Sequence, residues 1–243
     1  MDNVHQTLVN KLKEHSKLTA DDMTGIETIN YAVRHLGPNE DLIRQGDTTK
    51  ASALVLHGML ARYHLMPNGR RQYLSYHLKG DVPDAQMLFI EKMDHGLCAM
   101  DHAMVASIPH SELMRVFHAR PTIGFAVWRE TLIDSAIFRE AITNNSARST
   151  LARLAHFFCE LFYRAKASGL TRRNTLDVPI GLNQLGETLA MSLATVNRAL
   201  LNLRETNAAN FKGGELTVFD WAALQDLGEF DPSYLHIVRK PRF

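Results

Sequence analysis

The sequence predicts an α+β chain, in which a strand-rich N-terminal half leads through a long helix into a helical C-terminal half. Between residues 32 and 109, short apolar runs alternate with turns rich in glycine, proline and asparagine, which is typical of an all-β unit. From Pro121 onwards, apolar residues recur instead at helical spacing. With 243 residues, of which 45% are hydrophobic and 22% are charged, the chain is long enough for two domains with packed cores.

The strand-rich half is predicted to be a small roll preceded by helix. The first 30 residues are expected to be helical, because Leu8, Leu12 and Ile26 follow one another at helical spacing. The strands indicated by the later apolar runs are 54–56, 59–66, 72–78, 97–100 and 103–108. Asn68 and Gly69 indicate a hairpin with a tight type I′ turn, since both tolerate positive φ angles. Strands this short and closely spaced favour a barrel or a jelly-roll-like β-roll.

A long apolar helix is predicted to start at Pro121 and to run to about residue 143. Trp128 and Leu132 widen its apolar surface beyond the stripe that one core covers. We therefore expect this helix to pair with a second copy of the chain; a helix buried within its own domain is the alternative. The polar run at 143–146 predicts a hinge, so the expected domains are 1–145 and 146–243.

The C-terminal half is predicted to begin with a helix over 147–168, which a glycine ends, and to continue with a short strand at 176–178. Further along, a glycine turn at 212–215 precedes an apolar strand at 216–219, which indicates a two-stranded hairpin. A last helix is expected at about 220–227. A hairpin in this position is the wing of a winged helix.

Between these elements, the sequence predicts a helix-turn-helix at about 182–205. Gly186 is small at the point where two short helices must approach each other closely, and Ala190 lies in the turn between them. Ser192 is a good N-cap for the second helix. The side chains that can pack inward are Leu185, Leu189, Val196, Leu200 and Leu203. A helical hairpin with a purely structural role is the alternative interpretation.

The outward face of the second helix carries the candidate DNA contacts. They are Ser192, Leu193, Ala194, Thr195, Asn197, Arg198 and Asn202. Arg198 can form a bidentate pair with guanine, and Asn197 or Asn202 can pair with adenine in the major groove. The hydroxyl groups of Ser192 and Thr195 can reach phosphate.

Charge is distributed unevenly along the chain. The net charge is +1, yet residues 146–212 carry 9 Lys or Arg against 4 Asp or Glu, whereas residues 1–145 carry 15 against 17. The basic block contains the predicted helix-turn-helix, and an anionic partner is expected in this part of the chain. Four of its arginines either contact phosphate or are ordinary solvated charges: Arg148, Arg153, Arg172 and Arg173.

Three stretches carry a resemblance to a known family. They read RLAHFFCEL at 153–161, TVNRAL at 195–200 and EFDPSYLH at 229–236. In the strand-rich half, the turns at Gly58 and at Gly80 lie where the same family has turns. On these residues, and over nearly its whole length, the chain resembles the Crp–Fnr family of transcription regulators, of the type found in alphaproteobacteria.

The resemblance implies an N-terminal β-roll of the cyclic-nucleotide-binding type as a sensor domain, a dimerisation helix at about 121–143 and a C-terminal winged helix-turn-helix. It also implies a homodimer that binds inverted repeats in double-stranded DNA, with recognition helices about 34 Å apart, and that recruits or blocks RNA polymerase. Where the family's recognition helix carries Arg-Glu, this chain has Leu193 and Ala194. Its target sequence is therefore expected to differ from the well-known ones.

The resemblance also places an effector pocket at Gly80, Asp81, Asp84, Met93 and Asp94. Nucleotide-binding members of the family carry a Glu that holds the ribose and, about ten residues later, an Arg that clamps the phosphate. Here Met93 and Asp94 stand where that Arg-Ser pair is expected, and Asp94 would repel a phosphate. Cyclic AMP is therefore not expected as a ligand, and the identity of any other effector stays open.

Cysteine and histidine patterns predict no cofactor. The iron–sulfur members of the family need several N-terminal cysteines, whereas this chain has only Cys98 and Cys159, so neither a cluster nor a disulfide is expected. Four potential metal ligands lie close together in the sequence: His95, Cys98, Asp101 and His102. Their spacing matches no metal motif, and ordinary surface and strand positions are expected. No catalytic motif occurs, so an enzyme is not expected.

Two function classes remain after these exclusions. No apolar run approaches the roughly 20 residues that cross a bilayer, and the N-terminus does not look like a signal peptide, so a soluble cytoplasmic protein is expected. The leading hypothesis is a sequence-specific DNA-binding regulator. The alternative is a small-molecule or redox sensor whose winged helix serves only as a protein-interaction module. The two hypotheses differ in whether Arg198 discriminates between bases.

Overall fold

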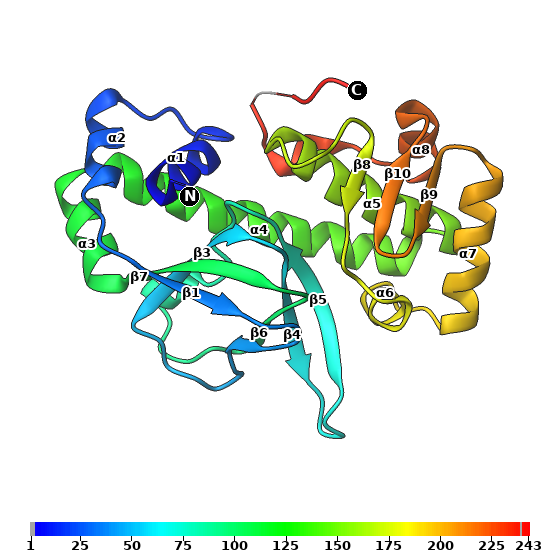
Figure 1. The fold of residues 1–243 in the computed structure, drawn as a ribbon, viewed down its shortest axis with the longest axis horizontal. Coiled ribbons are helices and arrows are strands. Elements are labelled where there is room, and N and C mark those ends of the chain that lie inside the picture. Colours follow the sequence, from blue (N-terminus) through cyan, green and yellow to red (C-terminus); the bar gives the residue numbers. More distant parts are fainter. Residues whose placement is uncertain (1–2, 239) are drawn as a thin grey trace. The chain divides into compact units, whose positions relative to one another are not determined.

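The computed structural model describes residues 3–238 and 240–243. Its internal contacts divide the chain into two compact units, of which the first ends at Asp134 and the second begins at Ser135 (Figure 1). This division lies before the domain boundary predicted after residue 145.

Two capped helices open the first unit, as the sequence predicts for its first 30 residues. They are α1 (Val4–Lys13) and α2 (Ala20–Glu27). The Asn3 side chain caps α1 by accepting a hydrogen bond from the Gln6 amide, and Thr19 and Asp22 form a capping box at the start of α2. The buried apolar face of α1 packs into a cluster that also contains residues of the roll and of the long helix. This packing fixes α1 against the roll.

Seven strands form the β-roll of the first unit. They are β1 (Ala32–Leu36), β2 (Asp41–Ile43), β3 (Ala51–His57), β4 (Leu60–Leu65), β5 (Arg71–His77), β6 (Gly96–Ala99) and β7 (Ala103–Pro109). They pair antiparallel in two sheets, of order β1-β7-β3 and β2-β6-β4-β5. Buried residues of both sheets, among them Val55, Leu60 and Val105, meet in one apolar cluster. The predicted roll is confirmed, and β1 and β2 are strands that the apolar runs did not indicate.

The hairpin between β4 and β5 forms by a different turn from the one predicted. Gly69 has a positive φ of 79°, but Asn68 is not among the residues with positive φ, so the turn is not of type I′. Instead, the Asn68 side chain accepts a hydrogen bond of 3.0 Å from the Arg70 amide. Asn68 therefore stabilises the turn through its side-chain oxygen rather than through a positive φ angle.

The helices α3 (His110–Ala119) and α4 (Pro121–Ala147) follow the roll. The hinge predicted at 143–146 is wrong, because α4 continues through these residues. The hydroxyl groups of Thr143 and Ser146 donate to the carbonyl oxygens of Arg139 and Ile142 within the same helix. Polar side chains that bond back to the preceding turn are compatible with helix, which the composition of this run did not reveal.

The second unit is a helical domain with a small sheet. Its further elements are α5 (Thr150–Ala167), β8 (Thr175–Asp177), α6 (Leu182–Thr188), α7 (Leu193–Glu205), β9 (Ala209–Lys212), β10 (Glu215–Val218), α8 (Trp221–Leu227) and a 3-10 turn at Pro232–Leu235. Ser149 caps α5, and Gly169, with a φ of 70°, follows its end. Along α5, Leu154, Phe158 and Phe162 are almost completely buried. The predicted two-stranded wing is part of a three-stranded sheet of order β8-β10-β9.

Within the described part of the chain, no helix is both long enough and apolar enough to cross a membrane.

Candidate nucleic-acid interface

The turn between α6 and α7 is built by backbone contacts that only small residues allow. A Cβ atom on Gly186 would lie 2.7 Å from the Met191 carbonyl oxygen, which confirms that this position needs glycine. The Met191 amide donates to the Gly186 carbonyl oxygen at 2.8 Å. Ala190 adopts a φ of 52°, in the left-handed region that side chains disfavour. The turn between α6 and α7 is therefore tight, and the backbone at Ala190 is strained.

One face of α7 packs into the second unit, and the opposite face is exposed. Val196, Ala199 and Leu203 are buried, whereas Leu200, predicted to pack inward, is only half-buried. Of the seven candidate DNA contacts, six are exposed and Thr195 is half-buried. Ser192 caps the helix by accepting from the Thr195 amide at 3.2 Å, and the two hydroxyl oxygens lie 2.9 Å apart. The predicted contacts therefore share one accessible face.

The polar side chains of this face differ in their freedom. The Asn197 amide nitrogen donates to the Leu193 carbonyl oxygen at 3.0 Å, one turn back in the same helix. Arg198 is exposed, and no carboxylate of the described residues lies within ion-pair distance of its guanidinium group. Five N–H donors in a fixed planar arrangement are thus available for a partner. Arg198 is the side chain best prepared to contact a guanine edge.

The sequence left two interpretations for the arginines of the basic block, and for two of them the structure indicates a third. Arg153 donates from Nη1 to the Leu189 carbonyl oxygen at 2.9 Å and so holds the end of α6 against α5. Arg148 is largely buried and pairs with Glu140 at 2.8 Å. Both arginines therefore support the scaffold of the helix-turn-helix. Arg172 and Arg173 are exposed on the loop after α5.

The two outer family-like stretches, 153–161 and 229–236, contact each other in the second unit. The Tyr234 hydroxyl donates to Glu160 at 2.8 Å, and His156 Nδ1 lies 3.0 Å from the Gly228 carbonyl oxygen. Burial raises the pKa of Glu160 and the pKa of Tyr234, and it lowers the pKa of His156. A Cβ on Gly228 would lie 2.6 Å from the His156 amide nitrogen. These contacts attach the C-terminal segment to α5.

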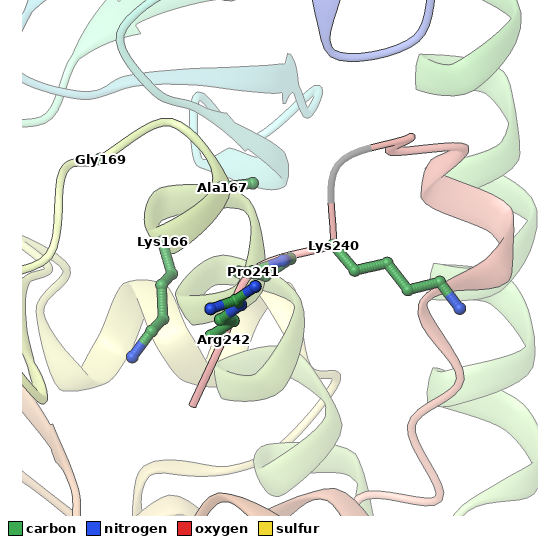
Figure 2. Close-up of a pocket in the computed structure, with 6 residues that line it drawn as sticks. All are labelled: Lys166, Ala167, Gly169, Lys240, Pro241 and Arg242. Atoms are coloured by element: carbon green, nitrogen blue, oxygen red, sulfur yellow. The ribbon is translucent and has the colours of Figure 1, made fainter.

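A basic pocket of about 630 Å³ lies at the C-terminal end of α5 (Figure 2). It is lined by Lys166, Ala167, Gly169, Lys240, Pro241 and Arg242, and the side chain of Lys240 extends away from the other two cations. Lys166 is in the last turn of α5, where a cation stabilises the free helix carbonyls, so its presence has a structural reason. The pocket is about 20 Å along α5 from Arg153, at 1.5 Å per residue. It is therefore separate from the turn that Arg153 holds.

The five residues of the predicted effector pocket have different surroundings in the structure. Asp81 accepts from the Leu78 amide and pairs with Lys11 at 2.9 Å, close to Gly80. Met93 is buried in an apolar cluster, and the Asp94 side chain is 85% exposed. Asp84 is fully buried and accepts from the Ala53 amide at 2.8 Å. Burial raises the pKa of Asp84 to about 7.

The interior of the roll also contains a buried arginine, Arg62, which was not among the predicted site residues. Arg62 is 2% exposed, on β4. Its Nη1 pairs with Asp134 on α4 at 2.8 Å and lies 3.5 Å from the Ser75 hydroxyl, while Nη2 donates to the Pro83 carbonyl oxygen. The available signal was an arginine inside the otherwise apolar start of a strand. Its partner, 72 residues away, could not be inferred from a local pattern.

Neither cofactor of the family fits these residues. A cyclic nucleotide needs a cation for its phosphate, but Arg62 already pairs with Asp134 and donates to the Pro83 carbonyl oxygen, and Asp81 and Asp84 add negative charge. An iron–sulfur cluster needs several accessible thiolates. Cys98 and Cys159 are both buried, and burial raises the pKa of Cys98 to about 11.

A second buried charge cluster links α1, the roll and α4. Lys11 Nζ lies 2.9 Å from Asp81 and 3.2 Å from Glu130, and His15 Nε2 lies 2.8 Å from Glu130. Burial by itself raises the pKa of Glu130. The charge of Lys11 and the hydrogen bond from His15 outweigh burial and hold this pKa below its usual value. The α4 helix is therefore attached to the first unit at both Glu130 and Asp134.

The four potential metal ligands in the stretch at 95–102 have different surroundings. Cys98 is buried within β6, whereas Asp101 and His102 are exposed. Over residues 3–238 and 240–243, no group of three His, Cys, Asp or Glu side chains is arranged to hold a metal ion.

Comparison with known proteins agrees with both units. Residues 33–120 match the model of the cyclic nucleotide-binding domain, and residues 152–227 match the Crp-like helix-turn-helix domain. The transcriptional activator protein FnrA of Stutzerimonas stutzeri is 23% identical over 203 residues, which are 84% of this chain and 83% of that protein. The nitrogen fixation regulation protein FixK of Bradyrhizobium diazoefficiens is 22% identical over 213 residues, covering 87% and 88%.

The fold is also similar to a solved structure. FixK2 from Bradyrhizobium japonicum aligns with a TM-score of 0.73 at 20% identity, over 82% of this chain and 98% of that one. The two domain matches occur in the order that a roll followed by a winged helix-turn-helix requires, and the relatives are transcription regulators. The chain therefore belongs to the Crp–Fnr family and is a DNA-binding transcription regulator.

Proposed function

We propose that the protein works as a homodimer that binds an inverted repeat in double-stranded DNA. The observation that carries the proposal is the exposed face of α7, where Arg198 has no ion-pair partner among the described residues and is flanked by the other candidate contacts. A helix of this kind fits the major groove with its N-terminal turns toward the base edges. Arg198 is the proposed reader of a guanine, and Ser192 and Thr195 are the proposed phosphate contacts.

An exposed apolar stripe on α4 supports the dimer. Phe125, Trp128 and Leu132 are 65%, 55% and 49% exposed, and their spacing puts them near one face of the helix. Large apolar side chains gathered on one face indicate an interaction surface. A second copy of α4 would cover them, and two-fold symmetry of the dimer would then require a two-fold symmetric DNA site.

Selection from a random pool of double-stranded DNA tests this proposal. Purified protein at near-physiological salt, without added ligand, should enrich an inverted repeat with half-sites about one helical turn apart. Arg198→Ala should abolish the enrichment, whereas Arg204→Ala, an exposed arginine in the last turn of the same helix, should retain it. A failure to enrich any motif, with or without cell extract, would favour the alternative of a protein-interaction module.

We further propose that DNA binding requires no cyclic nucleotide. The support is the pairing of Arg62 with Asp134 and the burial of Asp84 in the same roll interior. Calorimetric titration with cyclic AMP and cyclic GMP should detect no binding, and neither nucleotide should change the affinity for the selected DNA. Saturable binding of either nucleotide at micromolar concentration would contradict the proposal.

RNA polymerase is the proposed protein partner, because a DNA-bound regulator acts by recruiting or blocking it. The proposed place of action is the bacterial cytoplasm, where the chromosome lies, and we propose no catalytic role. In vitro transcription from a promoter that carries the selected site would distinguish an activator from a repressor. No change in transcript level with the site present, compared with a scrambled site, would contradict this part of the proposal.

A further inference from the structure

The first turn of α7 presents apolar side chains where a DNA-reading helix needs sequence contacts. Leu193 is 47% exposed, and Ala194, beside it, is also exposed. Leu193 opens the helix directly after its Ser192 cap. Within the second unit, the Leu193 side chain is therefore not buried in the core, whereas the Val196 side chain is buried.

The neighbouring polar group is less available than its position indicates. The Asn197 amide is bonded to the Leu193 carbonyl oxygen at 3.0 Å. A bidentate pair with adenine uses both the amide nitrogen and the amide oxygen, so Asn197 would first have to leave this bond. In the first two turns, the side chains that need no rearrangement are the Arg198 guanidinium and the apolar groups of Leu193 and Ala194.

An apolar side chain in the major groove has one good partner. The base edges there present hydrogen-bond donors and acceptors, and the thymine 5-methyl group is the one apolar feature. A leucine placed against any other edge would cover polar groups without pairing them, which is unfavourable. We propose that Leu193 contacts the 5-methyl group of a thymine, at one fixed position of each half-site, near the guanine read by Arg198. This inference rests on the proposed dimeric reader and adds its base specificity.

Removal of single methyl groups from the DNA tests the inference. In the selected site, each thymine is replaced in turn by uracil, which keeps the base pair and deletes only the 5-methyl group. One position in the half-site should show an affinity about fourfold lower, which corresponds to about 0.8 kcal/mol for one buried methyl group. The same replacement in both half-sites should multiply the loss to about sixteenfold, since two copies of Leu193 are involved.

A double-mutant cycle assigns the effect to Leu193. Leu193→Ala should bind the thymine and uracil probes with equal affinity. Leu201→Ala is the matched control, because Leu201 is 55% exposed on the same helix but about 12 Å further along its axis, and this variant should keep the fourfold difference. A second probe with 5-methylcytosine, paired with guanine, in place of the sensitive thymine should bind better than the same probe with cytosine.

Three outcomes would overturn the inference. They are a selected half-site without a thymine, a uracil scan without any sensitive position, and a sensitivity to uracil that survives in Leu193→Ala. None of them affects the dimeric reader, which is judged separately by the loss of the inverted repeat in Arg198→Ala. Because Leu193 is exposed, its replacement by alanine should leave the thermal unfolding temperature nearly unchanged, so a loss of folding cannot imitate the expected result.

Discussion

The interior of the β-roll and the outward face of α7 each contain an arginine, and the two arginines differ in burial and in ion pairing. Arg62 is 2% exposed and is paired with Asp134 and with backbone carbonyl oxygen. Arg198 is exposed, and no carboxylate of the described residues pairs with it. A buried cation must be neutralised within the chain, whereas an exposed one can keep its donors for a partner. The roll therefore uses the charge of Arg62 to hold α4, whereas the charge of Arg198 on α7 stays available for a partner.

The comparison predicts its largest effect for the pair of buried Arg62 and half-buried Asp134. Asp134→Ala leaves the Arg62 guanidinium buried with one acceptor fewer, which should lower the free energy of unfolding of the first unit by about 3–5 kcal/mol. Urea unfolding followed by the fluorescence of Trp128, in a Trp221→Phe background that removes the other tryptophan, measures this loss.

The matched control for Asp134→Ala is Glu40→Ala. Glu40 pairs with Arg34 at 3.2 Å on the surface, where both side chains are 46% exposed. Its removal should change the unfolding midpoint much less, because water and salt already screen such a pair. Equal losses in the two variants would remove the distinction between internal and surface charge on which the comparison depends.

The next largest effect is a dependence of stability on pH that comes from Asp84. Burial raises the pKa of Asp84 from its ordinary value of 3.8 to about 7 in the folded state, so the folded chain retains a proton that the unfolded chain has lost. This contribution stabilises the fold fully below pH 4 and is lost as the pH rises through about 7.

Asp84→Asn isolates this contribution. The asparagine oxygen can still accept from the Ala53 amide, but it carries no charge at any pH. The variant should be more stable than the parent protein at pH 8, by an amount on the order of a few kcal/mol, and the difference should shrink toward pH 4. His95, whose pKa is lowered to about 4 by burial, is unchanged in both proteins and cancels in the comparison. A difference in stability that is constant with pH would contradict the assignment.

Structural features whose determinants are local could be predicted from the sequence alone. The close approach at Gly186 and the cap at Ser192 are features of a few neighbouring residues, and both were predicted correctly. The pairing of Arg62 with Asp134 depends on the folding of the roll against α4, and no local pattern contains it. The predicted hinge at 143–146 was wrong for a related reason. Whether polar residues end a helix depends on what their side chains bond, and here Asn144 and Asn145 bond to the Arg153 and Thr188 carbonyl oxygens.

A smaller effect per half-site is expected on the exposed side of the comparison. Arg198→Ala should weaken specific binding by about 1–3 kcal/mol for each half-site, the range for a bidentate pair with guanine. Because the side chain is exposed and has no ion-pair partner in the part of the chain that the structure describes, the free energy of unfolding should change by less than about 0.5 kcal/mol. Fluorescence anisotropy with the selected site and chemical unfolding measure the two quantities. A large loss of stability with little loss of affinity would reverse the roles assigned to Arg62 and Arg198.

The smallest predicted effect concerns the strained turn that presents α7. Ala190 has a φ of 52°, which costs an alanine about 1 kcal/mol relative to glycine even after the extra chain entropy of glycine is considered. Ala190→Gly should therefore raise the thermal unfolding temperature of the second unit by a few degrees and leave DNA affinity unchanged. Gly186→Ala should have the opposite sign and a larger size, because its Cβ would lie 2.7 Å from the Met191 carbonyl oxygen. If Ala190→Gly weakened DNA binding instead, the strain at this turn would help to hold α7 in position for DNA binding. The exposed face of α7 would then depend more strongly on the internal structure of the second unit than the comparison with Arg62 implies.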